Sequence, residues 1–208
     1  MEENLQQEQL RAIFISLDEW ATGLATSKPV ASPPPSKELE SLILQLLVHN
    51  HSLWLQEDFV RRRDVADSAI VDAKRTIDAL NQKRNDTIEM IDMWLFENYY
   101  RHHGDSDVPL RTETPGSAFD RLSILSLKIY YMSEQTQRKD VDETHRLSCA
   151  RKLEILRQQQ RNLQRALEDM VVALNQGAIK MVLYRQFKMY NDPNLNPQLY
   201  QAEKRKES

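Results

Sequence analysis

The sequence has a single cysteine among 208 residues, and this excludes two kinds of structure. With Cys149 alone, the chain cannot form an intramolecular disulfide or a thiolate zinc cluster. A lone cysteine is most often a small buried apolar residue. We therefore expect Cys149 to lie in the core and to have no chemical role.

Glycine and long apolar runs are also scarce. Four glycines argue against a β-rich fold. The longest apolar run, Leu42 to Val48, is interrupted by Gln45 and is far too short to span a bilayer. The amino terminus, MEENLQQEQ, is acidic and polar, whereas a signal peptide begins with basic residues followed by apolar ones. These features predict a cytoplasmic protein with no membrane insertion.

An excess of positive charge is missing as well. The formal net charge is −3, whereas domains that hold nucleic acid by neutralising its phosphates are usually strongly basic. No glycine-rich phosphate loop is present, and no spacing of serine, cysteine, histidine and aspartate predicts a nucleophile beside its base. The net charge therefore predicts no nucleic-acid partner. Because none of these motifs is present, the sequence identifies no catalytic residue.

What the sequence does contain is apolar residues at helical spacing along most of its length. They predict one all-α domain over residues 1–208, an elongated bundle of about five helices with a C-terminal arm. Its parts are an N-terminal helix (1–26), a proline-rich linker (27–36), the helical bundle (37–190), and an arm with a tail (191–208).

Boundary signals divide the bundle into four helices. Ser36 is the expected N-cap of the first, which runs to about Arg63, and Asp64 or Asp67 is expected to cap the second. The third begins at Ser117, where Ser117 and Asp120 have the spacing of a capping box. The fourth runs from Thr144 to about Asn175, and Gly177 follows as a stop signal.

Polar residues recur along the two central helices and favour a lined cleft or a solvated face. One position is unusual: Arg84 interrupts an apolar row that includes Ile77, Leu80 and Ile88. A buried guanidinium must be paired, and paired buried charges often lie at functional sites. We expect Arg84 to be mostly buried against Asp78, Glu57 or Asp120. The candidate ligand-binding residues on these helices are Asn50, Trp54, Glu57, Arg61, Lys74, Asp78, Asn81, Arg84 and Asn85.

The start of the third bundle helix is a candidate anion site. Pro115 and Gly116 predict a tight turn, after which free backbone N–H groups and the helix dipole favour a negative charge. Gly116, Ser117 and Arg121 are the candidate ligand-binding residues there, and Arg121 and Lys128 are also expected near the cleft of the central helices. Capping by Asp120 would compete for the same donors.

Glu89 and Asp92 have the ExxD spacing that turns two carboxylates to one side of a helix. All-α nucleotide pyrophosphohydrolases hold magnesium in this way, together with a glutamate pair on another helix. Here Glu57 and Asp58 are adjacent in sequence and cannot share a face, so the match is poor. A magnesium site at Glu89 and Asp92 is therefore a weak alternative, and no other metal or cofactor is predicted.

Four long motifs resemble a known family. They are LWxxED from Leu53, KRxIDxLNQxRNDxIExID from Lys74, TETPGSxxDRLSILxLKIY from Thr112, and YRQFKMYNDPxLNPxLY from Tyr184. Together they are similar to the bacterial domain-of-unknown-function 4254 family over nearly the whole chain. The family carries a histidine after the tryptophan, where this chain has Leu55. The resemblance implies a bacterial protein and gives no activity. It further implies a link to glycosyltransferases of cell-envelope polysaccharides.

Two main functions follow as hypotheses. The first is binding or processing of a phosphorylated small molecule, a sugar phosphate or nucleotide sugar, in cell-envelope glycan metabolism. The second is a helical scaffold or interaction module whose arm contacts a partner, either in a homodimer or with a protein of a glycosyltransferase pathway. The magnesium-dependent pyrophosphohydrolase is a further alternative.

Overall fold

The computed structural model describes residues 5–100, 107–187, 189, 192–198 and 201. Over these residues the chain forms five α-helices and one π-helical turn, and it contains no strand. The α-helices are α1 (Gln7–Ala25), α2 (Glu38–Phe59), α3 (Asp67–Leu95), α4 (Pro115–Gln137) and α5 (Glu143–Asn175), with the π-helical turn η1 (Phe96–Tyr100) continuing α3. The predicted all-α bundle of about five helices is confirmed.

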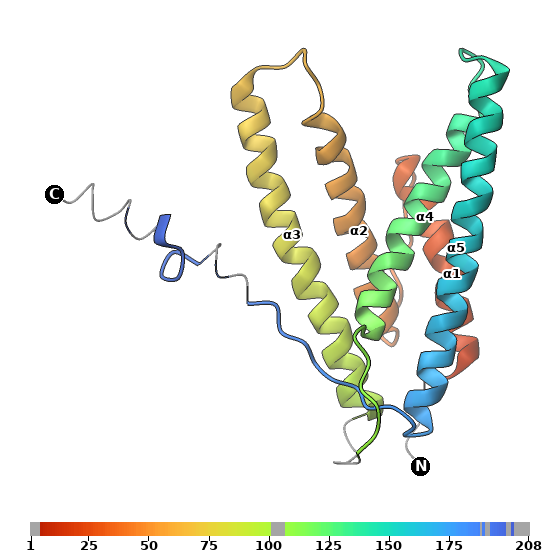
Figure 1. Ribbon diagram of the computed structural model, residues 1–208, viewed down its shortest axis with the longest axis vertical. Coiled ribbons are helices and arrows are strands. Elements are labelled where there is room, and N and C mark those ends of the chain that lie inside the picture. Colours follow the sequence, from red (N-terminus) through yellow and green to blue (C-terminus); the bar gives the residue numbers. More distant parts are fainter. Residues whose placement is uncertain (1–4, 101–106, 188, 190–191, 199–200, 202–208) are drawn as a thin grey trace.

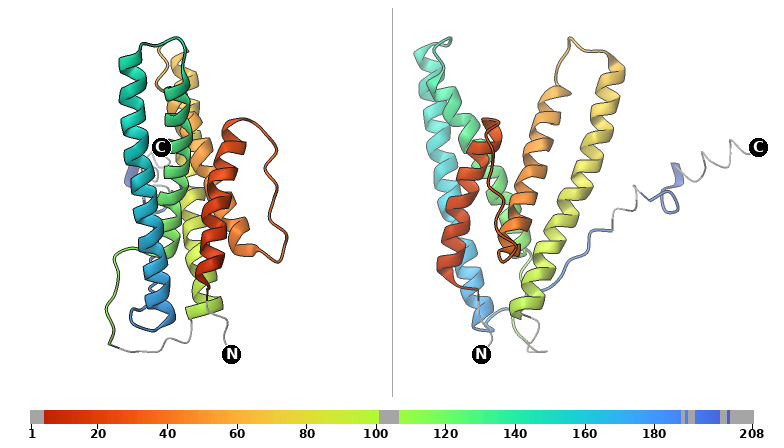
Figure 2. Two further views of the ribbon diagram at one scale, coloured as in Figure 1. Left: turned by 90° about the vertical axis from the view of Figure 1, so that its right-hand side faces the viewer. Right: turned by 180° about the vertical axis from the view of Figure 1, so that it is seen from behind.

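The helices form two hairpins that diverge like the arms of a V (Figure 1). One hairpin contains α2 and α3, and the other contains α4 and α5. The end of α3, the start of α4 and the end of α5 converge at the base of the V. α1 packs against α4, α2 and α5, and the proline-rich linker loops outward before α2 begins (Figure 2).

The core lies where the apolar faces of the helices meet. α1 buries Leu10, Ile13, Phe14, Leu17 and Ala21. The predicted apolar row of α3 is buried at Ala73, Ile77, Ile88, Ile91 and Leu95. Phe119 and Leu122 of α4 are almost completely buried, and Cys149 is buried as expected. None of the helices in the described ranges is long and apolar enough to cross a membrane.

Several predicted helix starts are wrong by one to three residues. α2 begins after Lys37 rather than Ser36, and α3 begins after Ala66, and neither start has a side-chain cap. α4 begins at Pro115, with Thr114 as its N-cap, so the predicted start at Ser117 is too late. The cap of α5 is Asp142, whose Oδ1 accepts a hydrogen bond of 2.7 Å from the backbone N–H of His145.

After Gly177, which has a φ of 65° and ends α5, the chain becomes a strap that crosses to α3. We use "strap" for residues 178–187. The predicted bundle extended to residue 190, whereas helix α5 ends at Asn175. Ile179 and Met181 bury their side chains, and Glu89 of α3 accepts hydrogen bonds from Arg185 Nη1 at 3.1 Å and from the backbone N–H of Gln186 at 2.7 Å. Most of the predicted tail from residue 201, and residues 101–106 of the predicted loop, lie outside the described residues.

Candidate functional site

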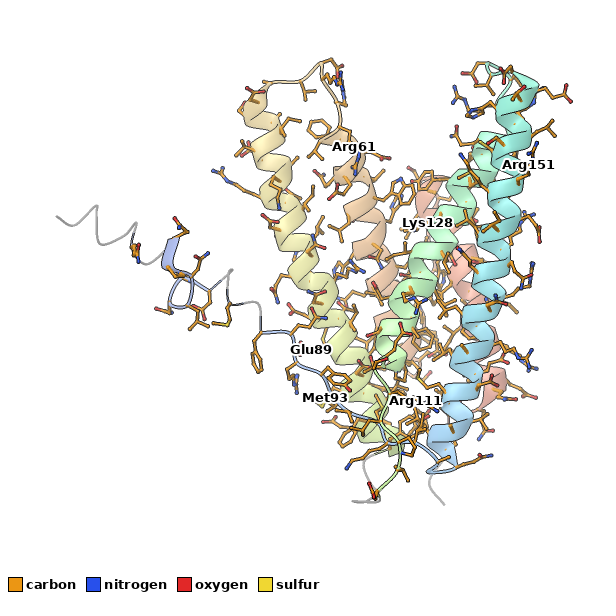
Figure 3. The ribbon with its side chains drawn as sticks, in the orientation of Figure 1. Arg61, Glu89, Met93, Arg111, Lys128 and Arg151 are labelled. Carbon is orange, nitrogen blue, oxygen red and sulfur yellow. The ribbon has the colours of Figure 1, made fainter. Side chains whose placement is uncertain are left out.

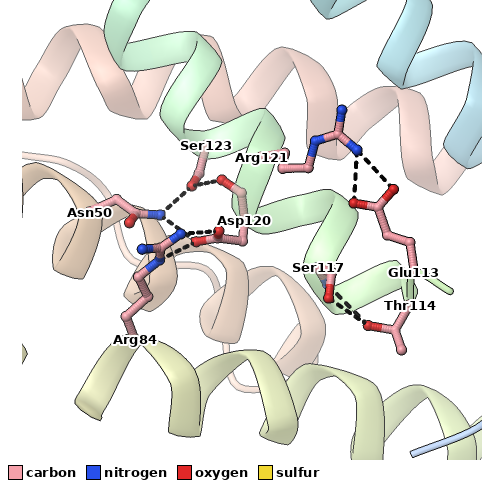
Figure 4. Close-up of polar contacts among 8 residues, drawn as sticks. All are labelled: Asn50, Arg84, Glu113, Thr114, Ser117, Asp120, Arg121 and Ser123. Carbon is pink, nitrogen blue, oxygen red and sulfur yellow. Dashed lines mark hydrogen bonds and ion pairs between the residues drawn. The ribbon is translucent and has the colours of Figure 1, made fainter. Parts of the chain in front are cut away.

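Arg84 lies at the centre of a polar cluster that joins three helices (Figure 4). Its Nε donates to Asp120 Oδ1 at 2.7 Å, and its Nη2 bonds the other carboxylate oxygen. Asn50 of α2 donates to the same Oδ1 at 2.9 Å and to Ser123 Oγ at 2.7 Å. Ser123 in turn donates to the backbone carbonyl of Asp120 at 2.8 Å. This cluster therefore links α2, α3 and α4.

Burial makes this cluster a strong structural link. The side chain of Asp120 is 8% exposed and that of Arg84 is 28% exposed. The hydrogen bond to Asp120 raises the pKa of Arg84 and so favours its charged form. The prediction that Arg84 is mostly buried and bonded to a carboxylate is confirmed, with Asp120 as the partner. Its two-point attachment also fixes the plane of the guanidinium.

A cleft of about 460 Å³ opens above this cluster, between the α2–α3 hairpin and α4. Many of the predicted ligand-binding residues line it: Asn50, Trp54, Glu57, Arg61, Asn81, Arg84 and Lys128. Leu53, Asp58, Ile124 and Leu127 complete the lining. Figure 3 shows Arg61 near the upper end of α2 and Lys128 on α4. These residues therefore line a cleft, and binding of a ligand by them stays a prediction.

The charges in the cleft are only partly neutralised. Arg61 pairs with Glu57 through an Nη1–Oε2 distance of 2.9 Å, and Arg84 pairs with Asp120. Lys128 and Asp58 form no hydrogen bond or ion pair within the part of the chain that the structure describes. Over the same residues, Nη1 of Arg84 has no hydrogen-bond partner. The cleft thus offers two cationic donors and one carboxylate acceptor to a ligand.

Trp54, which lines the cleft, belongs to an aromatic stack whose other member, Tyr131, the sequence reasoning missed. Trp54 stacks on Tyr131 with ring centroids 4.8 Å apart and planes 10° from parallel. Tyr131 Oη also lies 3.0 Å from His51 Nε2, and burial raises the pKa of Tyr131 and lowers that of His51, so both favour their neutral forms. The spacing of Ile124, Lys128 and Tyr131 along one face of α4 could have placed Tyr131 here.

The predicted anion site at the start of α4 is already filled by a side chain of the protein. Asp92 of α3 accepts from the backbone N–H of Gly116 at 2.7 Å and from Thr114 Oγ1 at 2.6 Å. The backbone N–H of Ser117 is bonded to Thr114 Oγ1 at 3.2 Å. The backbone N–H groups of Gly116 and Ser117, which were expected to be free, therefore already have hydrogen-bond acceptors within the protein. The predicted capping box is wrong, because Asp120 faces Arg84 instead of the helix start.

Other predicted residues lie outside the cleft. Arg121 pairs with Glu113 and lines a groove between α4 and α5, which shares Ile124 and Lys128 with the cleft. Lys74 and Asp78 are exposed and pair with each other one turn apart, as on an ordinary solvated helix face. Asn85 is partly exposed and does not contribute to the lining.

Glu89 and Asp92 do not converge on a common point. Asp92 bonds the start of α4, whereas Glu89 bonds the strap through Arg185 and Gln186. Across the described ranges there is no group of three or more histidine, cysteine or acidic side chains arranged to hold a metal ion. The geometry that the pyrophosphohydrolase hypothesis requires is absent from this pair.

A family model described as a protein of unknown function, DUF4254, matches residues 40–182. The chain belongs to this family. The DUF4254 match begins inside α2 and ends within the strap, so it includes every residue that lines the cleft. α1 and the proline-rich linker precede the matched segment. No curated protein and no solved structure matches the chain.

Proposed function

We propose that the cleft binds a small phosphorylated molecule, and that a sugar phosphate or a nucleotide sugar is its ligand. The observation that carries this proposal is the position of Arg84, which lines the cleft while Asp120 holds its guanidinium through two bonds. An N–H group held in place before binding loses little rotamer entropy when a ligand arrives. Nη1 of Arg84 is therefore a preorganised donor for a phosphate oxygen.

The remaining lining suits the rest of such a ligand. Lys128 provides a second, flexible positive charge from α4. Asp58 provides an acceptor for sugar hydroxyl groups, and Trp54 provides a flat apolar surface beside which a sugar or base ring could pack. A volume of about 460 Å³ is within the usual range for small-molecule pockets. The link to glycosyltransferases that the family resemblance implies favours a ligand of cell-envelope glycan metabolism over other phosphorylated molecules.

Titration calorimetry tests this function directly. Glucose 1-phosphate and UDP-glucose are titrated into the wild type, with glucose and inorganic phosphate as partial ligands and with magnesium present or absent. Lys128→Ala should weaken binding of the phosphorylated ligands about tenfold or more, because a charge-assisted hydrogen bond is lost. Lys74→Ala removes an exposed lysine outside the cleft and serves as the matched control.

The outcomes separate the hypotheses. Equal affinities for the wild type and Lys128→Ala would remove this cleft as the phosphate site. Absence of binding by both phosphorylated ligands would contradict the proposed ligand class. A requirement for magnesium would instead revive a metal-dependent mechanism.

The end of the strap and the chain that follows it favour a second candidate, an interaction module. Phe187 is 84% exposed, Met189 58% and Leu195 49%. Apolar side chains exposed so close together in sequence are typical of a segment that docks on a partner. Light scattering after size-exclusion chromatography measures whether the wild type is a homodimer. If it is, Phe187→Ser should halve the measured mass. A monomeric wild type would exclude the homodimer, so the partner would have to be a protein of different sequence.

A further inference from the structure

A second pocket, of about 530 Å³, lies between α1, the start of α2 and the end of α3. It is separate from the cleft and shares no lining residue with it. Its walls include two aromatic rings, Trp94 and Tyr99, and its floor includes Ile13 and Leu39, which are almost fully buried. It therefore combines aromatic and aliphatic surface.

The π-helical turn brings the two rings together. Trp94 is near the end of α3, and Tyr99 lies five residues later within η1. In a regular α-helix, residues five apart would point about 140° from one another. The wider π turn, in which residues five apart are bonded, reduces this angle. The ring centroids are 5.6 Å apart and the planes are inclined by 70°, so the rings form two adjoining walls.

Three carboxylates line the same pocket as these rings. Glu38 Oε2 accepts a hydrogen bond of 2.9 Å from the Trp94 indole N–H, and this bond orients the ring. Glu40 is paired with Lys37 at 3.5 Å. The carboxylate of Glu8 forms no hydrogen bond or ion pair with any residue that the structure describes. The lining thus carries three carboxylates and one ammonium group, a net negative charge beside aromatic rings.

We propose that this pocket binds a small organic ammonium ion. Aromatic rings attract cations through their quadrupoles, and quaternary ammonium ligands are recognised by aromatic walls of this kind. The carboxylates add a Coulombic attraction that a neutral ligand would not use, and they would repel an anion. A bare metal ion fits less well, because no metal-binding group of acidic side chains occurs in the described part of the protein. π-helical turns also occur frequently at functional sites.

Choline and 3,3-dimethylbutan-1-ol test the proposal, because they have nearly the same shape and differ in charge. Saturation-transfer NMR and titration calorimetry on the full chain should show binding of choline and not of the neutral alcohol. Tyr99→Leu should weaken choline binding about tenfold, since one aromatic wall is lost. Glu8→Gln should weaken it less, because this residue acts through charge alone.

Lys128→Ala alters a residue that does not line this pocket, so it should bind choline as the wild type does, and the two sites are tested separately. Circular dichroism melting tests whether Tyr99→Leu remains folded. If this variant unfolds, the choline affinity of Glu8→Gln tests the proposal instead. Equal binding of choline and the alcohol, unchanged choline binding by both variants, or no binding by the wild type would each overturn the proposal.

Discussion

At the scale of single residues, Arg84 and Asp120 are the pair on which the position of the cleft depends. Arg84→Ala leaves a buried carboxylate without its cation, and we expect the free energy of unfolding to fall by about 3–5 kcal/mol. The exposed pair Lys74–Asp78 is the control, and Lys74→Ala should change stability by about 0.5 kcal/mol or less. Urea denaturation measures both. Similar losses for the two variants would show that the Arg84 pair is not a structural link.

Asp92 is predicted to make stability depend on pH. Burial raises its pKa from 3.8 to about 6, against the lowering effect of its bonds from Thr114 and Gly116. Because the folded pKa exceeds the unfolded one, this contribution to stability is fully present below pH 3.8 and is lost as the pH rises through about 6. The shift corresponds to roughly 3 kcal/mol.

The Asp92→Asn variant isolates this contribution from other titrating groups. The stability of the wild type minus that of Asp92→Asn should fall between pH 4 and pH 6 and level off above pH 7, as measured by denaturation at each pH. A difference that does not vary with pH would show that the Asp92 carboxyl titrates in the folded protein as it does in the unfolded chain.

At the scale of elements, the start of α4 depends on close contact with α3 at Gly116. A Cβ at this position would lie 2.7 Å from the backbone carbonyl oxygen of Ile88 and 2.8 Å from Asp92 Oδ1. Alanine normally stabilises a helix relative to glycine by up to about 1 kcal/mol. Here we expect Gly116→Ala to destabilise the protein by about 1–3 kcal/mol, because α4 must move away from α3.

Gly23→Ala is the matched control for this contact. Its Cβ would lie 2.8 Å from Val30 Cγ2, a methyl group of the linker that can move aside. Thermal or urea unfolding should therefore show little loss for Gly23→Ala and a clear loss for Gly116→Ala. The reverse order would mean that the junction of α3 and α4 adapts more easily than the linker.

At the scale of the whole molecule, the strap connects the end of α5 to α3 across the base of the V (Figure 1). Ile179 is 3% exposed, so Ile179→Ala should lower the free energy of unfolding by about 2–5 kcal/mol. Phe187 is at the far end of the strap and is mostly exposed. Phe187→Ala should therefore change the free energy of unfolding by about 0.5 kcal/mol at most. Denaturation of both variants measures whether the strap is part of the cooperative core.

The sequence by itself determined the helices, because helical periodicity, proline clusters and capping residues act over a few neighbouring positions. It also indicated that Arg84 needed a carboxylate, since a guanidinium in an apolar row must be paired. Only the tertiary structure decided that this carboxylate is Asp120, 36 residues away. The contact of Asp92 with the start of α4 was also decided only by the tertiary structure. Contacts between helices depend on how the helices pack, and local spacing does not encode that packing. The η1 turn, which places Tyr99 beside Trp94, likewise had no local signal in the sequence.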